Sequence, residues 1–103
     1  MDRHQANMER RRNRRIALGC EARLIVQGLA TPVDAICTEV AVGGLTLHAA
    51  YVPRSGERVE VLVAAPRGGL ALPALRVRAT VRRCQRGEAG NYEIGLEIIA
   101  VLD

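Results

Sequence analysis

Between residues 75 and 82 the chain alternates strictly between apolar and polar side chains. Leu75, Val77, Ala79 and Val81 are apolar, and three arginines and one threonine stand between and after them. A period of two indicates a β-strand with one buried face, because successive side chains of a strand point to opposite sides of the sheet. This segment therefore constrains the chain to a sheet that has a core on one side.

Five other segments show a similar alternation and are separated by residues that favour turns. Glycine or proline ends most of them, as at Gly28, at the pair Gly43-Gly44 and in the cluster from Pro53 to Gly56. The glycine pair must supply either a turn or a close backbone approach. Six short strands without a long helical segment favour a small antiparallel barrel or sandwich. The expected strands lie near residues 20–26, 33–40, 45–49, 59–63, 75–82 and 92–98.

The core predicted from these strands is aliphatic. Hydrophobic residues make up 49% of the 103 residues, yet Phe and Trp are absent, so Val, Leu, Ile and Ala must fill the interior. A chain of this length has enough surface to bury for one core and one domain. Cys20, Cys37 and Cys84 form no CxxC pair, which argues against a disulfide framework or a zinc site and fits a reducing compartment. We interpret them as small core residues.

The sequence also argues against a membrane segment. No apolar run reaches the roughly 18 to 20 residues that a membrane-spanning helix needs. The short apolar stretch from Ile16 to Leu18 is interrupted at once by Gly19 and Glu21, so it does not continue the arginine-rich N-terminus as an export signal. We therefore expect a soluble, cytoplasmic protein that does not insert into a membrane.

The basic residues are arginines without exception. All 15 of them are Arg, and six lie within the first fifteen residues. Residues 1–15 are almost wholly polar and show no apolar periodicity, so we expect them to form a flexible arm in front of a barrel of residues 16–103. A guanidinium forks onto phosphate or carboxylate oxygens and stacks on flat rings, which an ammonium does not. The arm therefore indicates an anionic partner, and it could also accommodate an aromatic one.

Three arginines on one expected strand, Arg76, Arg78 and Arg82, share a polar face. We interpret them as a solvated face, and the alternative is a wall that faces a ligand or a partner. Glu93 and Glu97 could pair with them if the two strands are neighbours, and each exposed pair would contribute about 0.2 to 1 kcal/mol.

Residues that could support catalysis are scarce. His4 lies in the arm and His48 on the third expected strand, and neither has a cysteine or carboxylate at the spacing of a triad or a metal site. Ser55, the only serine, lies in a turn without the strand-to-helix elbow of a hydrolase. The glycine pairs lack the spacing of phosphate-binding loops. We therefore expect a binding protein rather than an enzyme, with no metal and no cofactor.

The arginine run and the first glycine pair resemble the two motifs of the PilZ domain family, small bacterial barrels that bind the second messenger cyclic di-GMP. The family's first motif, RxxxR after another arginine, is matched by residues 11–15 with Arg10 before them. Its second motif, (D/N)xSxxG, falls on residues 39–44, EVAVGG. Residues 92–98 are similar to the family's last strand. The resemblance implies an all-β fold, a small six-stranded antiparallel β-barrel with a flexible basic N-terminal arm.

The resemblance also implies a site for cyclic di-GMP that both motifs form. The family's arginines contact the phosphates and stack on guanine, which assigns these roles to Arg11 and Arg15. In the second motif, Glu39 keeps an acceptor for the guanine edge but moves it by one methylene, whereas Ala41 lacks the serine hydroxyl. A lost neutral hydrogen bond costs about 0.5 to 1.5 kcal/mol, or roughly tenfold in affinity. The implied ligand-binding residues are Arg10, Arg11, Arg15, Glu39, Ala41 and Gly44.

Two functions follow from the resemblance. The first is a receptor module in which cyclic di-GMP orders the arm and creates a surface that an effector protein recognises. The alternative is a degenerate PilZ domain that no longer binds the nucleotide and acts as a protein-interaction module. A third hypothesis, nucleic-acid binding through the arm, lacks the interleaved aromatic residues that would stack on bases, because Tyr51 and Tyr92 are the only aromatics.

Overall fold

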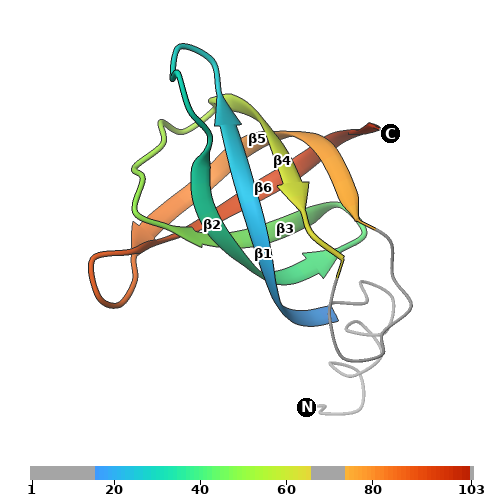
Figure 1. The fold of residues 1–103 in the computed structure, drawn as a ribbon, viewed down its shortest axis with the longest axis horizontal. Helices are drawn as coiled ribbons and strands as arrows, with labels where there is room; N and C mark the ends of the chain where they lie inside the picture. The colour runs from blue at the N-terminus through green and yellow to red at the C-terminus, as the bar shows by residue number, and fades with distance from the viewer. Residues whose placement is uncertain (1–15, 66–73, 103) are drawn as a thin grey trace, which may run out of the picture.

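The six expected segments form a closed antiparallel barrel. The computed structural model describes residues 16–65 and 74–102, and Figure 1 shows their strands wrapped around a single interior. The order around the barrel is β1-β2-β3-β6-β5-β4. The expected barrel is therefore confirmed, and the sandwich alternative is excluded. The strands are β1 Ile16–Val26, β2 Val33–Ala41, β3 Gly44–Ala49, β4 Arg58–Val63, β5 Leu75–Arg86 and β6 Tyr92–Leu102.

The arm, residues 1–15, lies outside the described residues, so its expected flexibility stays a prediction. Within residues 16–65 and 74–102 there is no helix that could cross a membrane.

The interior is filled by the apolar side of each strand. Leu24, Leu47, Val61, Val77 and Ile94 have no exposed surface. The residues predicted to point inward are buried along most of each strand, as the alternation requires. Both tyrosines, half-buried, pack against this aliphatic core.

The cysteines behave as small core residues. Cys20 and Cys37 are buried in the core, and Cys84 is half-buried against it. All three are free thiols. Burial raises the pKa of the Cys37 thiol to about 11, because an apolar surrounding disfavours the thiolate.

A β-bulge interrupts the alternation of β5. Val81 pairs with Leu96 and Arg83 pairs with Gly95, so Arg82 is an extra residue on β5. As a result two consecutive arginines, Arg82 and Arg83, both lie on the exposed side of the strand.

Three of the exposed arginines of β5 pair with acids on the two neighbouring strands. Arg82 Nε donates to Glu97 Oε1 at 2.6 Å, which confirms one of the expected pairs. Arg76 pairs instead with Glu60 of β4, with 3.1 Å between its Nη2 and Oε1. This differs from the expected pairing with β6, because Arg76 lies between β4 and the end of β6, across from Leu102.

The burial of Cys37 predicts a selective alkylation pattern. Since the thiolate is the nucleophile and the pKa of Cys37 is raised, we expect iodoacetamide at pH 8 to modify Cys84 well before Cys37 in the folded protein. Peptide mass spectrometry measures the two rates. In urea the rates should become similar, and equal rates in the folded protein would contradict the assignment of Cys37 to a closed core.

Candidate functional site

The second motif forms the hairpin between β2 and β3. Val42 and Gly43 make a two-residue turn, and Ala41 pairs with Gly44 on either side of it. The structure therefore brings three predicted site residues, Glu39, Ala41 and Gly44, to one end of one hairpin.

Gly44 is required by the packing of β3 on β6. A Cβ added at Gly44 would lie 2.6 Å from the carbonyl oxygen of Leu96, which is far too close for two non-bonded atoms. Since that oxygen belongs to the backbone, β6 would have to move. We expected the glycine pair to supply either a turn or a close backbone approach. Gly43 lies in the turn, and Gly44 allows the close approach. Gly44 thus has a structural function that does not depend on any ligand.

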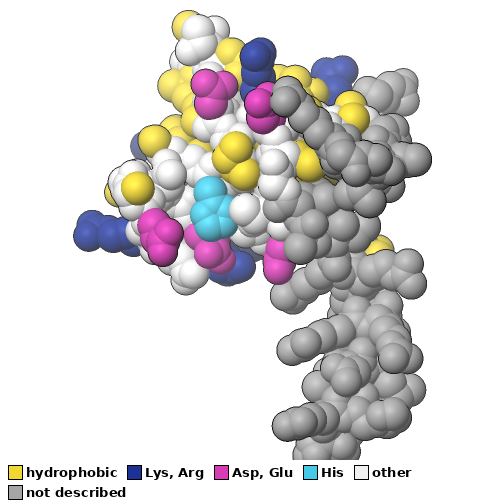
Figure 2. Space-filling model, turned by 60° about the horizontal axis from the view of Figure 1, so that its bottom comes forward, with side chains coloured by type: hydrophobic (Ala, Val, Ile, Leu, Met, Phe, Trp, Pro, Cys, Tyr) yellow, Lys and Arg dark blue, Asp and Glu magenta, His cyan; other side chains and the backbone are white. Residues whose placement is uncertain are grey.

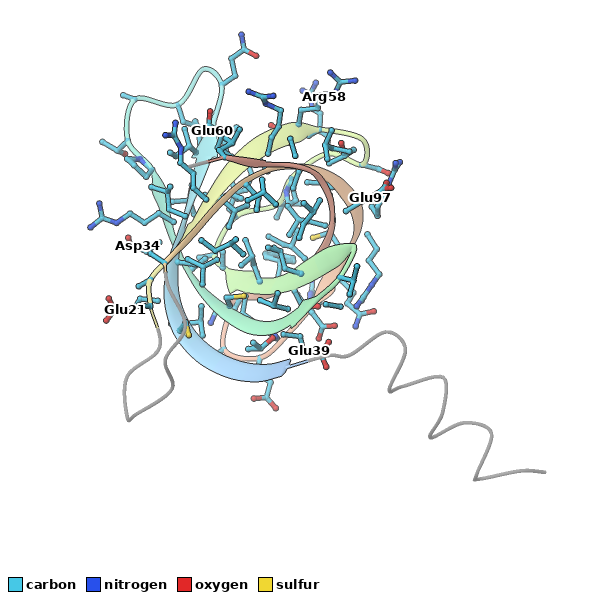
Figure 3. The ribbon with its side chains drawn as sticks, turned by 90° about the vertical axis from the view of Figure 1, so that its right-hand side faces the viewer. Glu21, Asp34, Glu39, Arg58, Glu60 and Glu97 are labelled. Carbon is cyan, nitrogen blue, oxygen red and sulfur yellow. The ribbon has the colours of Figure 1, made fainter. Side chains whose placement is uncertain are left out.

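A groove lies next to this hairpin on the barrel surface. Its volume is about 360 Å³, and we call it the hairpin groove. The hairpin forms one side, and β5 and β6 form the other. In Figure 3 the side chains of Glu39 and Glu97 point away from the barrel interior. The groove is lined by Glu39, Ala41, Val42, Gly43, Gly44, Leu45, Thr46, Arg82, Arg83, Gly95, Leu96 and Glu97.

One row of paired residues crosses the groove. Glu39 pairs with Thr46, Thr46 with Gly95, and Gly95 with Arg83. Adjacent strands are about 4.8 Å apart, so the backbone of Glu39 lies about 14 Å from that of Arg83 along the row. Thr46 has a short side chain and Gly95 has none, and the side chain of Arg83 lies over Gly95. Thr46 therefore separates the Glu39 carboxylate from the Arg83 side chain along the row.

The charges that line the groove balance formally. Glu39 and Glu97 oppose Arg82 and Arg83, and the arginines are held by acids of β6. Arg82 bonds to Glu97, and Arg83 Nη1 lies 3.2 Å from Glu93 Oε2. The described lining therefore offers donors and acceptors without an excess of positive charge.

The chain enters the barrel beside the groove. β1 begins at Ile16, which pairs with Val40, and the next residue, Ala17, pairs with Glu39. Figure 3 shows the start of β1 next to Glu39. The predicted arginines of the first motif, Arg10, Arg11 and Arg15, lie outside the described residues.

A larger cavity, about 840 Å³, lies elsewhere on the barrel between β1, β2, β4 and β5. Arg23, Asp34 and Leu62 are among its lining residues, and none of the predicted site residues is. It reaches Ala74, which borders a segment outside the described residues. We therefore place the candidate site at the hairpin groove.

The rest of the described surface gives no metal centre. Figure 2 shows acidic, basic and apolar side chains interspersed on one face of it. Across residues 16–65 and 74–102, no three His, Cys, Asp or Glu side chains gather closely enough to hold a metal ion. His48 is half-buried on β3, in the row between Ile36 and Glu93.

The three residues that complete the row from Glu39, namely Thr46, Gly95 and Arg83, were not predicted as site residues from the sequence. Arg76, Arg78 and Arg82 were interpreted as a solvated face, with a wall that faces a ligand as the alternative. Of these three arginines, only Arg82 lines the groove. One signal was available, because two adjacent arginines after Val81 break the period of two and indicate a bulge.

The chain belongs to the PilZ domain family, since a family model described as the PilZ domain matches residues 9–103. No curated protein matches the chain.

Two solved structures share the fold. The inhibitor of motility MotI/DgrA of Bacillus subtilis superimposes with a TM-score of 0.67 at 15% identity, over 85% of this chain and 42% of that one. This chain thus spans less than half of MotI/DgrA. The PilZ domain of YcgR from Escherichia coli, solved with c-di-GMP, gives a TM-score of 0.63 at 11% identity over 87% of this chain and 78% of that one.

The contact between β3 and β6 predicts opposite effects for two adjacent glycines. We expect Gly44→Ala to lower the free energy of unfolding by about 1 to 3 kcal/mol, because the methyl group would be forced against the Leu96 carbonyl. Gly43→Ala is the matched control, since a Cβ there meets nothing within 4 Å. It should leave stability unchanged or raise it by up to about 1 kcal/mol. Urea unfolding followed by circular dichroism measures both, and equal effects would contradict the close approach.

Proposed function

We propose that this PilZ domain is a receptor for cyclic di-GMP and that the ligand binds in the hairpin groove. The observation that carries the proposal is the register at the start of β1. Because Ala17 pairs with Glu39, the arginine-rich segment joins the barrel directly beside the second motif. The two motifs, separated in the sequence by β1 and most of β2, can thus act on one ligand. The fold shared with the YcgR domain, which was solved with c-di-GMP, supports the same ligand class.

The charge distribution assigns the phosphates of the ligand to the arm and the base to the groove. Cyclic di-GMP carries two phosphate charges, whereas the charged side chains that line the groove cancel formally. Net attraction must therefore come from the arm, and we assign the phosphates to Arg11 and Arg15 with a contribution from Arg10. The planar guanidinium groups can also stack on guanine.

The groove supplies the contacts to the base. Glu39 is an acceptor at the position of the family's acid or amide. Gly44 lines the groove and contributes by letting β3 approach β6 closely, because the Leu96 carbonyl fills the space that a Cβ would take. Ala41 lines the groove but has no hydroxyl to offer. We therefore expect weaker binding than in a domain with the complete second motif.

The proposed signalling step is a change in the arm when the ligand binds. We propose that the ligand orders the arm against the barrel and so creates a surface that an effector protein recognises. The domain then acts in the cytoplasm as a binding module and not as an enzyme.

The alternative is a domain that has lost the nucleotide and binds a protein partner. The observation in its favour is the altered second motif, in which Ala41 deletes one polar contact and Glu39 displaces another. It predicts that binding to the partner is indifferent to cyclic di-GMP.

Calorimetric titration of the full chain with cyclic di-GMP distinguishes the two functions. We expect measurable binding, which Arg11→Ala and Arg15→Ala abolish because each removes a guanidinium that we assign to the phosphates. Arg3→Ala removes an arginine of the arm outside the motif and is the matched control, with affinity expected to be nearly unchanged. A folded sample that gives no heat at high micromolar ligand would rule out the receptor.

Restoring the hydroxyl of the second motif should tighten binding. We expect Ala41→Ser to raise the affinity for cyclic di-GMP by about 2- to 12-fold, the equivalent of one neutral hydrogen bond. Ala50→Ser adds the same hydroxyl at an exposed position outside the groove and should have no effect. If both variants bind like the wild type, position 41 does not face the ligand.

A further inference from the structure

Because of the bulge in β5, Arg83 lies on the outer surface of the barrel, whereas in a regular strand it would point inward. In strict alternation from Val81, which is buried, Arg82 would point outward and residue 83 inward. The register shift between Val81 and Arg83 instead leaves both arginines outside, and Arg83 joins the row that ends at Glu39. Its side chain is 54% exposed, so its remaining donors are open to solvent.

Gly95 provides the path along which Arg83 crosses β6. A Cβ added at Gly95 would lie 2.8 Å from both Cγ and Nε of Arg83. The side chain of Arg83 thus lies directly over the glycine, in the space where any other residue would have a side chain. The ion pair with Glu93 uses Nη1 of Arg83, and a guanidinium has five N–H donors. The contact with Glu93 fixes the group over β6 and leaves other donors for a ligand.

The two ends of the row complement the two polar edges of guanine. A carboxylate such as Glu39 only accepts hydrogen bonds, and guanine offers N1–H and its amino group as donors. A guanidinium offers paired donors, which match guanine O6 and N7. Adenine has a donor amino group in place of O6, so it can satisfy neither side chain in this way. The carboxylate of Glu39 and the guanidinium of Arg83 over Gly95, with the short side chain of Thr46 between them, therefore discriminate between the two purines.

We infer that Arg83, held over Gly95, reads the O6/N7 edge of a guanine base from the wall opposite Glu39. The inference rests on the proposed binding of cyclic di-GMP and deepens it by naming a specificity residue outside both motifs. Arg83 compensates in part for the hydroxyl that Ala41 lacks, because it adds a fork of donors on the other side of the base.

The test compares the affinities of the full chain for cyclic di-GMP and cyclic di-AMP by calorimetry. We expect the wild type to prefer cyclic di-GMP and Arg83→Ala to reduce that preference at least about fivefold. Arg83→Lys should lose it similarly, since lysine keeps the charge but not the fork. Arg76→Ala is the matched control, because Arg76 is also exposed and ion-paired on β5 but lies outside the groove. Its preference should equal that of the wild type.

Gly95→Ala provides a second, independent measurement. The added methyl group displaces only the flexible side chain of Arg83 and meets no backbone atom among its nearest contacts. We expect the barrel to stay folded, as judged by circular dichroism, while the preference for cyclic di-GMP falls although every charged residue is retained.

The outcomes separate the two proposals. If the wild type binds cyclic di-GMP and both Arg83 variants keep its preference, or lose affinity for the two dinucleotides equally, the inference is overturned and the receptor function stands. If the wild type binds neither dinucleotide, both are overturned. A loss of preference in the Arg83 and Gly95 variants, but not in Arg76→Ala, supports the inference.

Discussion

The pairing of β3 with β6 is the constraint on which the rest of the structure depends. These strands are far apart in the sequence, and their contact closes one side of the barrel. At Gly44 the approach is so close that no side chain fits against the Leu96 carbonyl. The same contact lays the second motif beside Gly95 and, one strand further, beside Arg83. A shift of this register by one residue would turn the aliphatic face of either strand outward and would also take the groove apart.

The fold was predictable because its information is local. Alternation marks the buried face of each strand, and the turns fall where glycine and proline allow them. The strand ends were less predictable. β1 begins at Ile16 and not near residue 20, and β5 continues beyond residue 82 to Arg86. Both extensions contain or follow a register shift, between Ala17 and Cys20 and between Val81 and Arg83. A bulge changes which residues face outward, so a simple period of two fails there.

The candidate site was predictable only in part, for a related reason. Glu39, Ala41 and Gly44 belong to one hairpin, so their spacing in the sequence already places them together. Arg83 and Gly95 join them through two strand pairings of long sequence separation, and no local pattern reveals such a row. The first-motif arginines precede the described residues, so their contact with the groove stays a prediction. The register of β1 on β2 adds one fact, because it places Ala17, near the start of β1, beside Glu39.

The measurement that tests the central claim most directly is a two-dimensional amide NMR titration of the chain with cyclic di-GMP. If the ligand binds in the hairpin groove, the largest shift changes should fall on residues 39–46 together with Arg83 and Gly95, which meet only through the row across β2, β3, β6 and β5. Changes concentrated at Arg23, Asp34 and Leu62, around the larger cavity, would contradict it.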